Sequence, residues 1–184
     1  MLRPLFRTLG ILLVCCCAAL AVTARADDAA DIERMVDQGQ TQEALARLDS
    51  LLAQRAQDAP LRFLKGVLLT RLHRPDEAAT VFRQLNLDYP ELPEQYNNLA
   101  VIHAARGDYD QARVELESAL RANPSYAVAQ QNLGDVHAQL ARLAYERALK
   151  LDPASASIPP KLALLHDLVR SINAEPALHT APSR

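Results

Sequence analysis

The sequence predicts an all-α fold in which pairs of helices stack into a superhelix. First, a pattern of apolar, small and turn-forming residues returns after 34 positions, so that residues 98–100 (Asn-Leu-Ala) are followed by 132–134 (Asn-Leu-Gly). Second, between the turns apolar residues recur with the helical period, and no stretch alternates with period two. Third, turn residues come at regular intervals: Gly39, 73–75, 89–90, 107–108 and 123–124. A repeat of this length is a helix pair that buries its apolar face only by stacking on neighbours.

The first element of the chain is a signal peptide, expected at residues 1–26. A basic start precedes an apolar run at residues 9–22, and Ala24 and Ala26 are small residues at the two positions that a signal peptidase reads. We expect cleavage after Ala26, a periplasmic or secreted location, and no membrane insertion after cleavage. The alternative is a transmembrane anchor, although about fourteen apolar residues are few for a bilayer span.

All three cysteines, at positions 15–17, lie inside this apolar run. A lipoprotein would need a small residue before the modified cysteine, and Val14 is not one. The mature chain would therefore use neither disulfide nor thiolate chemistry. Because residues 1–26 carry three arginines and no acid, the rest has 17 basic and 22 acidic side chains, a net charge of −5. The absence of a basic tract argues against nucleic acid or anionic lipid as a partner.

The repeat domain is expected at residues 27–153, with repeats at about 27–58, 59–92 and 93–126 and a shortened one at 127–153. Within it and beyond it, helices are expected near 28–38, 41–55, 59–72, 75–88, 93–106, 109–122, 126–151 and 160–172. Pro75 is a good helix start, because proline presets φ at the first position and the acids at 76–77 lie at the positive end of the helix dipole. Asp108 is expected to cap the helix at 109–122.

The fourth repeat lacks about five residues where its turn should be. Residues 138–144 contain good helix formers and no breaker, so we predict one continuous helix from 126 to 151, roughly 39 Å long. A tight turn in the same segment is the alternative.

This helix would carry apolar side chains past the preceding repeat: Leu143, Tyr145, Ala148 and Leu149. Burial of large apolar side chains contributes several kcal/mol, so the linker and capping helix at 154–172 should turn back and cover them. The expected apolar face of this capping helix is Leu162, Leu165, Leu168, Val169 and Ile172. A second chain could cover them instead in a homodimer. Residues 173–184 are expected to be a disordered tail.

The spacing resembles the tetratricopeptide repeat. The match is most specific at residues 93–126, through Tyr96, Leu99, Ala100, Gly107, Tyr109, Ala112, Leu116, Ala119 and Pro124. Residues 59–92 match through Gly66, Ala78, Phe82 and Pro90, and 27–58 only through Gly39, Ala44 and Leu48. The resemblance implies a superhelix of about three and a half helix pairs with a C-terminal capping helix. It also implies a protein or peptide as the partner.

In this family the first helix of each repeat lines a concave groove, and the equivalent positions here are the candidate peptide-binding residues. They are Phe63, Val67, Arg71, Asn97, Asn98, Val101, Gln131, Asn132 and Asp135. A ladder of Asn98 and Asn132 could bind the backbone of an extended peptide, because an amide both donates and accepts. The alternative is that these asparagines only support the helix ends. The Lys and Arg of the family's chaperone-binding clamp are missing from the groove positions.

No catalytic, metal or cofactor site is expected. His103 and His137 occupy equivalent positions, but helices packed about 10 Å apart would keep their nitrogens from sharing one zinc. We expect both to pack between helices. Acids two residues apart, such as Glu115 and Glu117, point away from each other and are expected to be solvated. No nucleophile or phosphate-loop motif is present, so the chain is not expected to be an enzyme.

The expected function is a non-catalytic adaptor or scaffold in the bacterial cell envelope. The resemblance extends to envelope proteins that assist cell-wall synthesis, division or secretion-machine assembly, although a fold alone does not determine a function. Two alternatives stay open. The chain could be a self-associating structural subunit that uses its long helix, or the non-catalytic partner of a separately encoded cell-wall enzyme.

Overall fold

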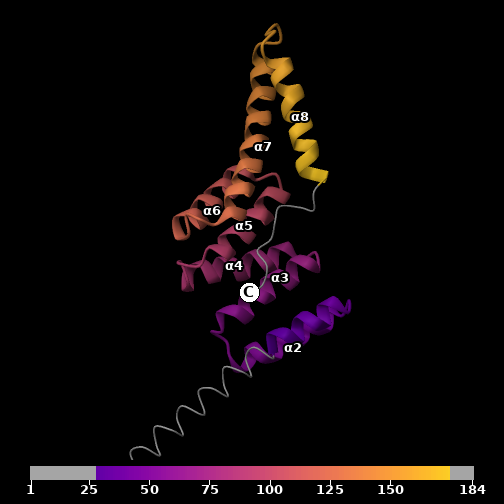
Figure 1. Ribbon diagram of the computed structural model, residues 1–184, viewed down its shortest axis with the longest axis vertical. Helices are drawn as coiled ribbons and strands as arrows, with labels where there is room; N and C mark the ends of the chain where they lie inside the picture. Colours follow the sequence, from indigo (N-terminus) through magenta and orange to yellow (C-terminus); the bar gives the residue numbers. More distant parts are fainter. Residues whose placement is uncertain (1–27, 175–184) are drawn as a thin grey trace, which may run out of the picture. The chain divides into compact units, whose positions relative to one another are not determined.

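The computed structural model describes residues 28–174, which form eight helices and no strand (Figure 1). The predicted signal peptide lies outside the described residues. The chain divides into two compact units, Met1–Gln57 and Asp58–Arg184. The prediction of an all-α repeat fold is confirmed, and the predicted helices are present with ends that differ by at most two residues.

The first unit contains a helix at residues 28–37 and α2 (Thr41–Gln54). Gly39 joins them in the left-handed region at φ +79°, where glycine has no steric penalty. Ile32 packs with Leu48 in a solvent-free core between the two helices. The carboxylate of Asp28 accepts a hydrogen bond from the Arg55 guanidinium and ties the two ends of the pair together.

The second unit begins with two regular helix pairs. They are α3 (Ala59–Arg71) with α4 (Pro75–Asp88), and α5 (Pro93–Ala105) with α6 (Tyr109–Ala122). Pro75 opens α4 as predicted, with two acids in its first turn. Asp108 does stand at the start of α6, but its side chain makes no capping hydrogen bond. Its carboxylate instead lies 4.0 Å from Nδ1 of His103 on α5, so the capping prediction was wrong.

Small residues allow the helices of each pair to approach closely. A Cβ atom at Gly66 of α3 would lie 2.6 Å from the ring of Phe82 on α4, which is fully buried. In the next pair, Ala100 occupies the position 34 residues later and is buried in a cluster with Ala112 and Leu116 of α6. The repeat therefore uses one small residue to admit the second helix.

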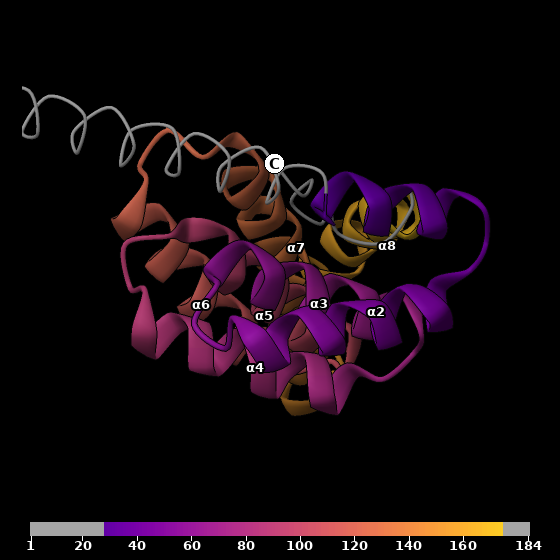
Figure 2. The same cartoon turned by 90° about the horizontal axis from the view of Figure 1, so that it is seen from below.

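The fourth unit is a long hairpin. Helix α7 (Ala127–Leu151) continues without a break through the segment where a turn was missing, so this prediction is confirmed. Helix α8 (Ile158–Ala174) runs back along α7, on the side away from α6 in both views (Figures 1 and 2). Ile158 and Leu162 are buried, and the four apolar side chains of α7 listed for covering are half-buried.

Two details of α8 differ from the prediction. Leu168 was expected in the covered face but is 48% exposed. The covered residues 162, 165, 169 and 172 form one stripe, and Leu168 is one position, about 100°, away from it. The helix also extends through Ala174, so the first two residues of the expected tail are helical, and residues 175–184 lie outside the described residues. No helix within residues 28–174 combines the length and apolar character that a membrane crossing requires.

Candidate peptide-binding face

The candidate residues lie on the first helix of each pair, α3, α5 and α7, on what we call the inner face. It consists of Phe63, Val67, Arg71, Asn97, Asn98, Val101, Gln131, Asn132 and Asp135. On each helix they recur about four residues apart, which places them along one side of that helix.

The asparagines of the inner face hold helices together. Asn132 donates from Nδ2 to Oδ1 of Asn97 over 2.8 Å, and both side chains are fully buried. Asn98 donates to the backbone carbonyl of Glu94 within its own helix, at 2.8 Å. The structure thus pairs Asn132 with Asn97 rather than aligning it with Asn98 in an open ladder. Because a buried amide that loses its partner costs about 1–3 kcal/mol, this pair fixes α5 against α7.

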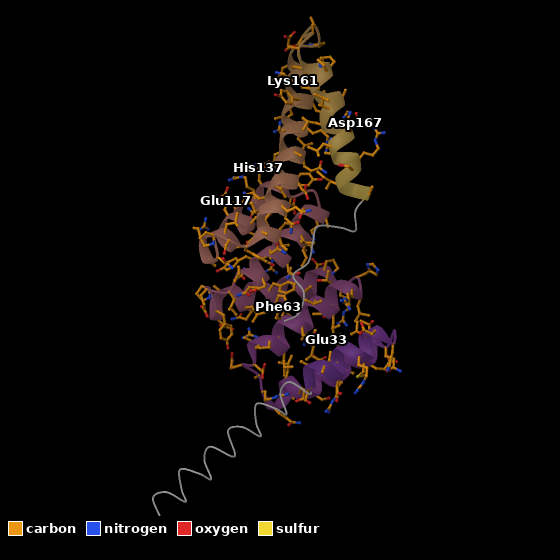
Figure 3. The ribbon with its side chains drawn as sticks, viewed as in Figure 1. Glu33, Phe63, Glu117, His137, Lys161 and Asp167 are labelled. Carbon is orange, nitrogen blue, oxygen red and sulfur yellow. The ribbon has the colours of Figure 1, made fainter. Side chains whose placement is uncertain are left out.

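The solvent-accessible part of the inner face lies on α3 and α7. Arg71 and Gln131 are exposed, and Phe63 and Asp135 are half-buried (Phe63 is labelled in Figure 3). One side of the Phe63 ring packs on Phe82, with 5.8 Å between the ring centroids. Val67 and Val101 are buried. The face therefore offers an aromatic edge and a cation on α3, and an amide and an acid on α7, with a rigid α5 between them.

An ion pair supports α3 from behind. Arg62 Nη1 lies 2.7 Å from Oδ2 of Asp88 at the end of α4. The hydrogen bond from Arg62 lowers the pKa of Asp88 below its usual range. Because the charged carboxylate is the bonded form, this contact persists at neutral pH and weakens only in acid.

Sequence reasoning missed Glu115 of α6. It was expected to be solvated, yet the side chain is half-buried, and desolvation raises the pKa of its carboxyl. A signal was available: the residue 34 positions earlier is Val81, an apolar residue that is also half-buried. Its neighbour Glu117 does lie toward solvent and pairs with Arg113 at 2.7 Å.

The two repeat histidines have different environments. His103 is covered by α6, its side chain is 18% exposed, and burial lowers the pKa of its imidazole. His137 is exposed on α7 (Figure 3). The expectation that both pack between helices was therefore right for His103 and wrong for His137, since no second helix folds back over this side of α7. Among the described residues, no three His, Cys, Asp or Glu side chains group as metal ligands would.

A stack of paired helices with an accessible inner face defines the class of repeat scaffolds. Two family models, both described as tetratricopeptide repeat, match residues 35–101 and 93–136. Together they span residues 35–136, more than half of the 184 residues. The chain belongs to the tetratricopeptide repeat family, as the sequence pattern predicted.

Solved structures share this fold. The crystal structure of MamA matches with a TM-score of 0.56 and 18% identity, over 76% of this chain and 86% of MamA. A tetratricopeptide repeat protein from Parabacteroides merdae ATCC 43184 matches with a TM-score of 0.57 and 17% identity, over 80% of this chain and 59% of that protein. A structure of Naa15/Naa10 bound to HypK-THB matches with a TM-score of 0.53 and 15% identity, over 81% of this chain and 23% of that one.

The family assigns a general role. Tetratricopeptide repeat proteins are generally non-catalytic adaptors, and their repeats are protein–protein interaction scaffolds. The chain is thus a repeat scaffold with protein partners.

Proposed function

We propose that the chain is an exported adaptor of the bacterial cell envelope that holds an extended segment of a partner protein along its inner face. One observation carries the proposal: exposed Arg71 and Gln131 stand on either side of α5, which the buried Asn97–Asn132 hydrogen bond fixes against α7. A rigid strip loses little conformational entropy when a peptide binds.

The chemistry of this strip favours a particular kind of peptide. The guanidinium of Arg71 suits a carboxylate, and the half-buried Phe63 ring suits an apolar side chain. Gln131 can donate to and accept from a peptide backbone, and Asp135 suits a cationic group. A partner segment with an acid at one end, an apolar residue near it and a base at the other end matches this order.

The test is photo-crosslinking in intact cells. A photoreactive amino acid replaces Gln131, and in a matched control it replaces Val114, which is 42% exposed on α6. We expect a crosslinked partner from position 131 that is absent from position 114 and weakened by Arg71→Glu. Equal crosslinking from both positions, or crosslinks only to random abundant proteins, would contradict binding at the inner face.

Export is part of the same proposal and is checked separately. The mass of the protein recovered from the periplasmic fraction should correspond to a chain that begins at Asp27, and Ala26→Asp should leave the longer form. A full-length chain in the cytoplasmic fraction of wild-type cells would overturn the envelope location.

A second candidate function, self-association, is favoured by α8. Leu164 is 72% exposed and Leu168 is 48% exposed, and four residues apart they share one side of the helix, away from α7. If this apolar pair joins two chains, light scattering of wild type should give a dimer mass, and Leu164→Glu with Leu168→Glu should give a monomer. A monomeric wild type would remove this candidate.

A further inference from the structure

The end of α8 lies close to the inner face. Helix α8 runs antiparallel to α7, and two contacts set its register: Lys161 Nζ lies 5.2 Å from the Tyr145 ring, and His166 Nε2 lies 3.7 Å from Oε1 of Glu146. Ala174 is eight residues beyond His166, about 12 Å further along the helix axis. It is therefore level with Ala138 of α7, one turn from Asp135.

Helix α8 also covers a continuation of the inner face. On α7, residues 131, 135, 138, 142, 145 and 149 form one helical stripe, with steps of three or four residues. Its first members are inner-face residues, and Tyr145 contacts α8. Ala138, between them, is buried. The chain therefore leaves α8 on the stripe that leads to Asp135 and Gln131.

The sequence after α8 favours an extended conformation. Pro176 cannot continue a helix and keeps the residue before it out of the helical region, and Pro182 has the same effect further on. Ten residues follow Ala174, and as an extended chain of about 3.1 Å per residue they reach about 31 Å. Two steps between neighbouring helices, from α7 to α5 and on to α3, need about 20 Å.

We propose that residues 175–184 continue the path of α8 and lie extended across the inner faces of α7, α5 and α3. The chain then covers its own binding face, and a partner must displace this segment. Leu178 is the one large apolar residue of the segment. About 12 Å of extended chain separates it from Ala174, so it reaches α5 and the edge of α3, where Phe63 is half-buried.

Tethering makes this competition effective. A segment joined by a short connection has an effective concentration in the millimolar range, so even a weak peptide contact occupies the face. When the segment covers the face nine-tenths of the time, a partner binds with about one tenth of its intrinsic affinity. The regulation rests on the proposed function, but the position of the segment does not.

The first experiment locates the segment without any partner. In the purified full chain, a photoreactive amino acid replaces Leu178, and crosslinked peptides are mapped by mass spectrometry. We expect crosslinks within one molecule to α5 and α3. Crosslinks to the outer helices α4 and α6, crosslinks between two copies, or no preferred position would each overturn the proposal.

The second experiment measures displacement. Partner crosslinking from position 131 should rise about tenfold in Leu178→Asp and stay unchanged in the charge-matched Thr180→Asp, which replaces a residue that is already polar. Crosslinking unchanged by Leu178→Asp overturns the proposal and leaves the adaptor function standing. If Leu178 crosslinks to the inner face but no partner is captured at position 131, the adaptor function fails and the self-contact stands.

Discussion

The third repeat and the last unit start from the same pattern and reach different structures. Helix α5 carries Ala100 and His103, and α7 carries Gly134 and His137 at the equivalent positions. After α5 the chain turns at Gly107, which has φ +79°, and α6 folds back. After the equivalent point of α7 no turn residue follows, and the helix continues to Leu151. Loss of about five residues thus converts a helix pair into a rod.

The difference changes the environment of residues that the sequence makes look alike. The small residue of the third repeat, Ala100, is buried, and a Cβ at Gly66 in the repeat before would meet Phe82 at 2.6 Å. A Cβ at Gly134 would meet nothing within 4 Å. Position within a repeat therefore predicts burial only where the second helix is present to provide it.

Restoring the turn should have the largest effect. Insertion of Arg-Gly-Asp-Tyr-Asp, a copy of residues 106–110, after Gln139 should split α7 into two helices. The second helix should then fold back over Gly134 and His137, because the interrupted stripe gains the same closing geometry as α6. Hydrogen exchange should show an unprotected turn at the insertion, and chemical modification of His137 should slow. A control insertion of five alanines should keep one helix, and identical behaviour of the two insertions would refute the role of the turn.

The next effect compares core residues at matching positions of the two units. Leu116 is fully buried in α6, and Tyr145 holds the matching place before the closing Pro153 but is only half-buried. Leu116→Ala should lower the free energy of unfolding by about 2–5 kcal/mol, and Tyr145→Ala should cost less despite the larger side chain. Urea unfolding followed by circular dichroism measures both. A greater loss at Tyr145 would mean that the hairpin is the main core.

Two glycine substitutions should have opposite signs. Gly66→Ala should destabilise the chain by about 1–3 kcal/mol, because the added Cβ overpacks against the Phe82 ring. Gly134→Ala should stabilise it by about 0.5–1 kcal/mol, because alanine is the better helix former and the space is open. Thermal unfolding of both variants beside wild type provides the measurement. Equal signs would show that a helix does cover this side of α7 in solution.

The smallest effect depends on pH and concerns only the covered pair. Burial raises the pKa of Glu115 above the usual 4.5. At pH 7 the carboxylate is charged in both states and its burial opposes folding, so Glu115→Gln should raise stability. The gain should shrink as the pH falls through the raised pKa and vanish below the unfolded value, where the group is neutral in both states. Glu117→Gln, next to it on the solvent side, should show no such gain. Stability measured from pH 3 to 7 decides, and a gain that grows in acid would be the wrong sign.

Local rules were enough to predict most of the fold. Turn residues and the helical period gave the eight helices and, at 138–144, the absence of a turn, because helix propensity and turn chemistry act over a few neighbouring residues. The same rules identified Pro75 as a helix start. They failed at Asp108, whose carboxylate faces His103 rather than the helix end, because that choice depends on a neighbouring helix.

The amino-acid sequence alone determined the family, the repeat register and the continuous helix α7. Only the tertiary structure decided how the inner face is divided between support and access. The pairing of Asn97 with Asn132 crosses from one helix to another, and so does the covering of Glu115. Each depends on side chains about 30 or more positions apart in sequence, and no local pattern states which two will meet. The physical reason is that burial belongs to the packed pair of helices, whereas periodicity belongs to one helix.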